Sequence, residues 1–326
     1  MINSEGLRFV MRVAKVKSLN SCTNQKTIIM QEGKKNNTIL VPTDFSKVAD
    51  NAMHHAVAIA KTYGNEILLL HIVEESFLGS LFGSKNNIKE GLVGQMLQDK
   101  LNEVCKNIME TSGVKANGII REGRIYKTIL EVAGEIDCDS IVMGTMGAEG
   151  LGQITGSNSS RVISQAEVPV VVVKEKQIGE GYKNIVFPVD LTLESKQKTW
   201  WAIHLAKKFD STIHIIGEHE SDQFLRNKLL ANLKAIEEVL IKNNVKFTSK
   251  ILDDEKYPGK FYLDTLQFAD EINADLIMIM TQQEKGFSEF LIGSYAQQIV
   301  NYHSSVPVMC IVPRNTGLVP IGWSGF

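Results

Sequence analysis

An internal repeat constrains the fold of this chain more than any other feature of its sequence. Residues 184–190 (NIVFPVD) match residues 38–44 (TILVPTD) at an offset of 146 residues. Near the end of each copy, Val168-Pro169-Val170 corresponds to Val306-Pro307-Val308. A period of about 140 residues is far longer than the unit of a solenoid, so the sequence predicts two copies of one domain.

Each copy alternates short apolar runs with segments of helical periodicity. In the first copy the predicted strands are residues 38–41, 67–73, 118–121, 140–143 and 168–173, and the predicted helices are 46–63, 91–112, 125–136 and 157–165. Strands that alternate with helices indicate an α/β fold with a parallel sheet covered on both faces. The right-handed crossover rule leaves few ways to wind such a sheet.

The composition of the chain changes at four places, which predict the domain boundaries. Residues 1–35 are polar and turn-rich in their second half, and we expect them to be a disordered or loosely docked extension. The domains are predicted at 36–174 and 184–313, joined by a charged linker at 175–183. The apolar tail 314–326 is expected to dock on its own domain or on another subunit.

The overall composition excludes several classes of protein. A net charge of −2 and a pI near 6.4 argue against nucleic acid as a partner. No apolar run is long enough to predict a membrane span. The four cysteines lie far apart, with no Cys/His cluster, which is typical of a cytoplasmic protein without a zinc site or a disulfide framework. P-loop, GxSxG, HExxH and EF-hand motifs are absent from the sequence.

A glycine-bearing loop in the first copy is the main candidate for a binding site. The predicted strand 140–143 leads through Gly144 and Gly147 to Gly156, and a helix is predicted to begin at Ser157. Glycine lets the backbone approach a ligand closely, and a helix N-terminus presents free N–H groups to an anion. A phosphate group fits this pattern. The alternative is a connection whose glycines serve only the turn.

Several motifs together resemble the universal stress protein family. They are the turn Pro42-Thr43-Asp44-Phe45-Ser46, the strand Leu70-His71-Ile72-Val73, the loop Met143-Gly144-x-x-Gly147 and the pair Gly156-Ser157. The resemblance covers nearly all of residues 37–313, as a tandem two-domain member. It implies two Rossmann-like (HUP-type) domains, each an open five-stranded parallel sheet with strand order 3-2-1-4-5.

The resemblance also implies an adenine nucleotide as the ligand. ATP-binding members hold ATP, with or without Mg²⁺, beyond the carboxyl ends of strands 1 and 4. Carried over to this sequence, the nucleotide-binding residues are the turn after strand 1, the end of strand 2, the glycine loop and the start of the fourth helix: Pro42, Thr43, Asp44, Ile72, Met143, Gly144, Gly147, Gly156, Ser157 and Asn158.

The loop departs from the family pattern in both copies. In the first copy, the eight residues 148–155 are one fewer than the pattern has, and the loop can either close on the phosphates or displace Gly156 from them. In the second copy, Met280 and Gln283 replace the first two glycines, and Glu218 aligns with Ile72. We therefore expect the nucleotide loop of the second domain to be degenerate.

The sequence favours a cytoplasmic, non-enzymatic stress-response protein that binds ATP in its first domain. The family pairs antiparallel through its last strand, so residues 170–173 and 308–311 are predicted to form an intramolecular pseudo-dimer, with a homodimer as a further arrangement. The alternatives are a nucleotide-independent signalling or scaffold protein and a slow ATP hydrolase that uses Asp44. His54 and His55 are predicted at a helix surface or rim, and His71 inside a core strand.

Overall fold

The computed structural model describes residues 37–74, 92–144, 157–191, 198–252, 260–281, 294–302 and 304–312. The chain divides into a leading unit, Met1–Lys35, and a main unit, Asn36–Phe326, to which all of these residues belong. The predictions for the extension 1–35 and for the tail 314–326 therefore lie outside the described residues.

The first copy forms an open parallel sheet with helices between its strands. Its strands lie in the order β3-β2-β1-β4-β5, which confirms the predicted order. The elements are β1 (Thr38–Pro42), α1 (Lys47–Tyr63), β2 (Glu66–Val73), α3 (Leu92–Ser112), β3 (Ala116–Glu122), α4 (Ile125–Ile136), β4 (Ser140–Gly144), α5 (Ser157–Gln165) and β5 (Val170–Val173).

The second copy repeats this winding and extends the same sheet. Its last strand pairs antiparallel with β5, Met309 lying opposite Val171, so ten strands form one sheet in which the second copy runs β10-β9-β6-β7-β8. This pairing confirms the predicted contact between the two last strands. The elements are β6 (Asn184–Val189), α6 (Lys198–Phe209), β7 (Thr212–Gly217), α7 (Gln223–Lys242), β8 (Lys246–Ile251), α8 (Phe261–Glu271), β9 (Leu276–Met280), α9 (Ser294–Asn301) and β10 (Val308–Ile311).

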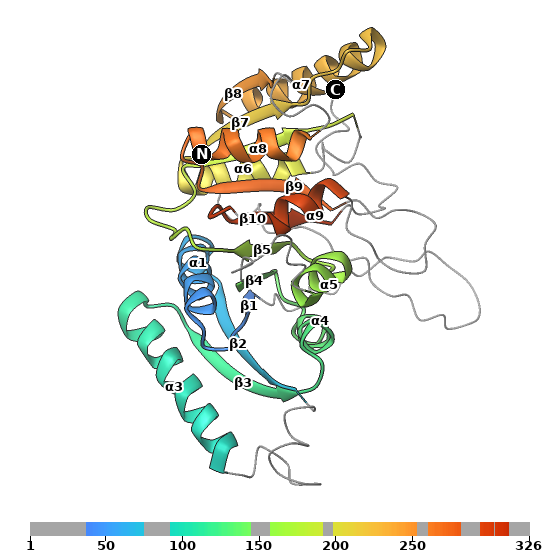
Figure 1. Ribbon diagram of the computed structural model, residues 1–326. Helices are drawn as coiled ribbons and strands as arrows, with labels where there is room; N and C mark the ends of the chain where they lie inside the picture. The colour runs from blue at the N-terminus through green and yellow to red at the C-terminus, as the bar shows by residue number, and fades with distance from the viewer. Residues whose placement is uncertain are drawn as a thin grey trace, which may run out of the picture. The chain divides into compact units, whose positions relative to one another are not determined.

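Helices cover both faces of the sheet. Helices α1, α3, α6 and α7 contribute to one buried apolar layer, and α4, α5, α8 and α9 to the other. In Figure 1, α1 and α3 lie on one side of the first copy's strands, and α4 and α5 on the opposite side. Strands covered on both faces are apolar at nearly every position, as in the four valines of β5, all of which are buried.

Capping side chains fix where the helices begin and end. Ser46 caps α1, its Oγ accepting a hydrogen bond from the N–H of Ala49 at 3.3 Å, and Asp222 caps α7 in the same way. Helix α1 ends at Gly64, whose φ of 74° is the left-handed conformation that glycine adopts without strain. These local signals explain why α1 begins where the sequence predicts.

The segment between β5 and β6 is bonded to helices of the second copy. The ammonium of Lys174 is buried and donates to the carbonyl of Tyr302 at 2.6 Å, just after α9. Lys176 donates to the carbonyl of Ala274 at 2.6 Å and lies 3.4 Å from the carboxylate of Asp275. Lysines placed near helix C-termini satisfy carbonyls that have no partner within the helix.

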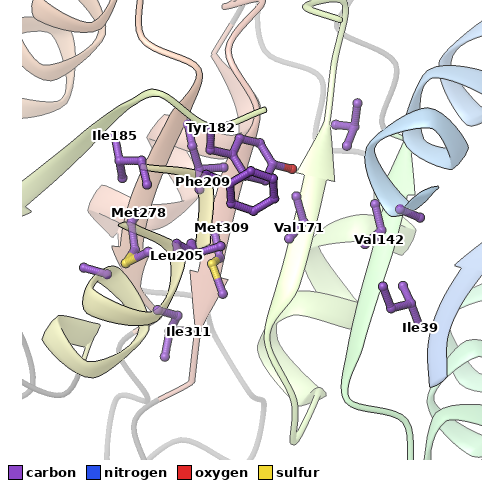
Figure 2. Packing of buried hydrophobic residues seen from close by; sticks show 14 of the residues in the cluster. Ile39, Val142, Val171, Tyr182, Ile185, Leu205, Phe209, Met278, Met309 and Ile311 are labelled. Carbon is purple, nitrogen blue, oxygen red and sulfur yellow. The ribbon is translucent and has the colours of Figure 1, made fainter. Parts of the chain in front are cut away.

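The same segment is bonded to α1 of the first copy. Asn51 donates through Nδ2 to the carbonyl of Lys174 at 2.8 Å, and His55 lies between the carbonyl of Lys176 and the hydroxyl of Tyr182. His55 is 1% exposed, so the prediction of a surface or rim position is wrong for this residue. Tyr182 is fully buried edge-on against Phe209, as Figure 2 shows. Tyr182, within the predicted linker, is therefore part of the core.

Candidate functional site

The two central strands of the first copy separate at their carboxyl ends. Strands β1 and β4 pair only at Ile39–Ser140 and Leu40–Ile141, although β1 continues to Pro42 and β4 to Gly144. The connections of the sheet reverse direction between these strands. In open α/β sheets such a switch point is where ligands bind, so the candidate site lies at this edge.

A network of hydrogen bonds fixes the turn that follows β1. The N–H of Thr43 donates to the carbonyl of Leu70 at 2.9 Å, and Nδ1 of His71 donates to the carbonyl of Thr43 at 2.8 Å. Phe45 adopts a φ of 62°, and its N–H donates to Oγ1 of Thr43 at 3.0 Å. A bulky residue with positive φ is strained, and here the surrounding bonds hold it in place.

Asp44 lies at the exposed rim of this turn. Its Oδ1 accepts a hydrogen bond from the N–H of Ser46 at 2.9 Å. The ring of Phe45 packs on His71 with centroids 4.8 Å apart, and the ammonium of Lys100 lies 4.3 Å from the centre of the Phe45 ring. These contacts orient the turn, so the carboxylate of Asp44 is presented at the edge of the sheet. A carboxylate at this place can accept hydrogen bonds from ligand hydroxyl groups.

Ile72 and Met143 bring apolar side chains to the same edge. Ile72 is half-buried near the end of β2, and Met143 is buried near the end of β4. Both pack with the apolar layer that contains α4 and α5. They can provide the apolar wall that a flat aromatic base needs.

Gly144 has a packing role that does not depend on a ligand. A Cβ atom at this position would lie 2.8 Å from the carbonyl oxygen of Val48 and 2.8 Å from its Cγ1. Distances below 3 Å from backbone atoms cannot be relieved by rotating a side chain. The start of α1 therefore requires glycine here, whereas the family pattern predicts this glycine for the approach of a ligand.

The helix α5 begins at Ser157, as predicted. Asn158 is half-buried in its first turn, and Arg161 lies over the ring of Tyr126, with Cζ 4.9 Å from the ring centre. Within the described part of the chain, the enclosed Oγ of Ser160 has no hydrogen-bond partner. Gly147, Gly156 and the side chain of Ser157 lie outside the described residues.

The second copy differs at the corresponding positions. Strands β6 and β9 pair only at Ile185–Leu276 and Val186–Ile277, the equivalents of the two pairs in the first copy. This register places the buried Met280 at the position of Gly144. Because α5 and α9 both begin with serine, Tyr295 takes the place of Asn158, and Glu218 that of Ile72. Larger or acidic side chains thus replace the residues predicted to bind a nucleotide.

Two residues position the candidate site through contacts that the sequence pattern does not predict. His71 is predicted as a core histidine whose polar atoms are satisfied, with a contact in the pocket as the alternative, and the structure identifies its partner as the carbonyl of Thr43. Val48 is predicted only as an apolar position of the first helix, because its contact with Gly144 joins two distant segments. The described residues contain no group of three or more His, Cys, Asp or Glu side chains that could hold a metal ion. No described helix is long and apolar enough to cross a membrane.

Comparison with known proteins identifies relatives of both copies. The model of the universal stress protein family matches residues 35–174 and again residues 181–312. Universal stress protein MJ0577 of Methanocaldococcus jannaschii is 34% identical over 155 residues, which cover 42% of this chain and 94% of that protein. Universal stress protein MJ0531 of the same organism is 40% identical over 140 residues, which cover 42% and 81%.

A solved structure has the same fold over most of the chain. A universal stress protein from Archaeoglobus fulgidus aligns with a TM-score of 0.69 and 22% sequence identity, over 86% of this chain and 100% of that one. The two family matches together span far more than half of the 326 residues. The chain therefore belongs to the universal stress protein family and carries two copies of its domain in tandem.

Proposed function

We propose that the first copy binds ATP at the edge where β1 and β4 separate, and that the second copy serves as its pairing partner. One observation carries the proposal. The turn containing Asp44, the apolar side chains of Ile72 and Met143, and the start of α5 at Ser157 all belong to elements that end or begin at this edge. These parts match the three chemical regions of a nucleotide, which are the ribose, the base and the phosphates.

Each region of the nucleotide has a suitable partner among the residues of the first copy. The adenine ring would pack against Ile72 and Met143, and the ribose hydroxyls would donate to the carboxylate of Asp44. The phosphates would accept hydrogen bonds from the first N–H groups of α5. Mg²⁺, when bound, would be held mainly by the phosphate oxygens and water, as is usual for this ion.

The start of α5 is well suited to an anion. No acidic residue lies in its first turn, so no carboxylate repels a phosphate there. The enclosed and unpaired Oγ of Ser160 is a polar atom that the described residues leave without a partner. Enclosed hydroxyl groups normally have a hydrogen-bond partner, and a ligand or an ordered water would supply one here.

A nucleotide-independent scaffold is the second candidate function, and Gly144 favours it. The contact with Val48 explains this glycine without any ligand. In that case the turn and the loop would be structural in both copies, and the protein would act through partners alone. Slow hydrolysis of ATP is not part of the proposal, because the proposal assigns the carboxylate of Asp44 to the ribose hydroxyls and not to an attacking water.

Isothermal titration of the full chain with Mg²⁺ and ATP tests the proposal. Ile72→Glu and Asn158→Tyr each introduce into the first copy the residue that the second copy has at that position. Ile72→Glu should weaken ATP binding at least about tenfold through charge repulsion, and Asn158→Tyr by a similar factor because the larger side chain takes up space. Asn107→Tyr, on an exposed position of α3, is the matched control and should bind like the wild type. If the wild-type protein does not bind ATP at millimolar concentration, the ATP-binding proposal is wrong and the scaffold function remains.

A further inference from the structure

A lysine lies in the interior of the second copy, where the first copy has an alanine. Lys198 is 2% exposed and begins the described part of α6. Helices α1 and α6 both end before a left-handed residue, Gly64 and Asp210, which fixes their alignment. On this alignment Lys198 corresponds to Ala52, which is completely buried. The methyl group of Ala52 in the first copy is thus replaced in the second copy by the long side chain of Lys198, which ends in an ammonium group.

The ammonium of Lys198 bridges the gap between the two central strands. Strands β6 and β9 stop pairing after Val186 and Ile277. Beyond this pair, Nζ of Lys198 donates to the carbonyl oxygen of Pro188 on β6 and, at 3.4 Å, to that of Met278 on β9. Carbonyl groups that have lost their partner in the sheet are therefore satisfied by one side chain.

Two further groups make this a built cation site. The Nζ atom lies 4.6 Å from the centre of the Phe187 ring, a cation–π contact. The carboxylate of Asp190, at the end of β6, is close enough to favour the charged form of Lys198. Burial lowers the pKa of Lys198 to about 8, so the side chain is mainly charged at pH 7. A buried charge is tolerated only with such compensation.

On the side of this edge where α8 and α9 lie, the second copy carries acidic groups, and the ring of Tyr295 takes up part of the space. Tyr295 stacks on Phe261 with centroids 5.4 Å apart, and its hydroxyl lies 2.9 Å from Oγ1 of Thr265. Burial raises the pKa of Tyr295, and the charges of Asp190 and Glu218 add to this effect. Both carboxylates therefore lie near the tyrosine. Asp190 is the equivalent of Asp44, so the acidic group that the second copy adds at this edge is Glu218, in the place of Ile72.

We propose that Lys198 is the built-in ligand of the second copy. Its primary ammonium occupies a cation site formed by the main-chain carbonyls of Pro188 and Met278, with the ring of Phe187 and the carboxylate of Asp190 beside it. The cation site of the second copy is thus permanently occupied by a side chain of the same copy. This inference does not rest on ATP binding by the first copy.

Chemical rescue tests the proposal. Lys198→Ala removes the ammonium and leaves space for a small amine, whereas Lys198→Met fills the space with an apolar chain of similar length. Both variants should melt several degrees below the wild type, because carbonyls and a carboxylate lose their cation. n-Propylammonium chloride should raise the melting temperature of Lys198→Ala but not that of Lys198→Met. Tetramethylammonium chloride at equal concentration should not stabilise Lys198→Ala in this way.

Two results would overturn the proposal. Either Lys198→Met melts like the wild type, which means that the ammonium is not needed, or Lys198→Ala responds equally to both amines. If Lys198→Ala does not fold by itself, it is refolded from urea with each amine. Soluble protein with n-propylammonium alone supports the cation site, and insoluble protein with both amines refutes it. No nucleotide is present in these measurements, so their outcome is separate from that of the ATP titration.

Discussion

The imidazole of His55 lies 3.0 Å from the hydroxyl of Tyr182, through Nδ1, and connects α1 to the segment that leads into β6. The other ring nitrogen, Nε2, lies 2.9 Å from the carbonyl oxygen of Lys176. A carbonyl can only accept, so Nε2 carries the proton and Nδ1 accepts from the tyrosine. The neutral ring is therefore fully satisfied, and this bond joins α1 of the first copy to the linker that leads into the second.

The stability of the protein should fall as the pH is lowered from about 6.5 to about 4. Burial lowers the pKa of His55 to about 4, and the hydrogen bond to Lys176 opposes the shift only in part. The unfolded chain, with a histidine pKa near 6.5, binds the proton first. Stability is thus complete above pH 6.5 and decreases below it, by about 3 kcal/mol at pH 4. Urea unfolding at a series of pH values measures the loss.

Two variants separate this effect from other titrations. His55→Gln removes the titrating ring and should flatten the dependence of the unfolding free energy on pH in this window. His54→Gln, at the exposed neighbouring position, should keep the dependence of the wild type. Equal slopes in the wild type and in His55→Gln would show that the buried imidazole is not the group responsible.

Tyr182→Phe should destabilise the protein without changing its fold. The change removes the hydroxyl that donates to His55 and leaves a buried nitrogen unsatisfied, which costs about 1–3 kcal/mol. The contact of the ring with Phe209 is kept. Tyr302→Phe, at a residue that is 46% exposed, is the control and should have little effect. Chemical denaturation of both variants measures the difference, and equal midpoints would contradict the assigned hydrogen bond.

Gly144→Ala should be strongly destabilising even without a ligand. The new Cβ would meet backbone atoms of Val48 at 2.8–2.9 Å, so α1 or β4 must shift, at a cost of about 1–3 kcal/mol. Gly134→Ala in α4 is the matched control, since nothing lies within 4 Å of its Cβ and alanine favours the helix. A circular-dichroism melt should rank Gly134→Ala above the wild type and Gly144→Ala below it. The opposite order would refute the packing role.

A single cysteine can test the register between the two last strands. Val170 lies opposite the native Cys310, so Val170→Cys places two thiols on facing positions of antiparallel strands. Such pairs have the spacing that a disulfide needs, and the bond would close a long loop and stabilise the protein by on the order of 3 kcal/mol. Peptide mapping after oxidation should find this disulfide. Val172→Cys, which faces Val308, should not form it; a disulfide there would mean a shifted register.

Local signals predicted most of the fold correctly. The helix at Ile125–Ile136 and the start of α5 at Ser157 agree with the structure, because the period of apolar residues and the capping residues act within a few positions of the chain. The antiparallel pairing of β5 and β10 followed from the family resemblance, since each edge strand alone says nothing about its partner.

Contacts between distant segments could not be predicted. His55 and Tyr182 are 127 residues apart, and a tyrosine in a glycine-containing linker resembles a surface residue. Lys198 gave no signal, because a lysine on a helix is normally solvated and only the tertiary structure provides the carbonyls that receive it. The candidate site was recognised as a pattern, whereas the role of Gly144 depends on where α1 packs.

The antiparallel contact between β5 and β10 has a consequence for how the two halves can change over time. In a symmetric homodimer every substitution appears on both sides of the two-fold axis, and the partners meet only above a certain concentration. Here the halves are joined covalently, so they meet at any dilution and carry independent sequences. Ala52 and Lys198 illustrate that freedom: the same helix position carries a buried methyl group in one half and a buried ammonium in the other.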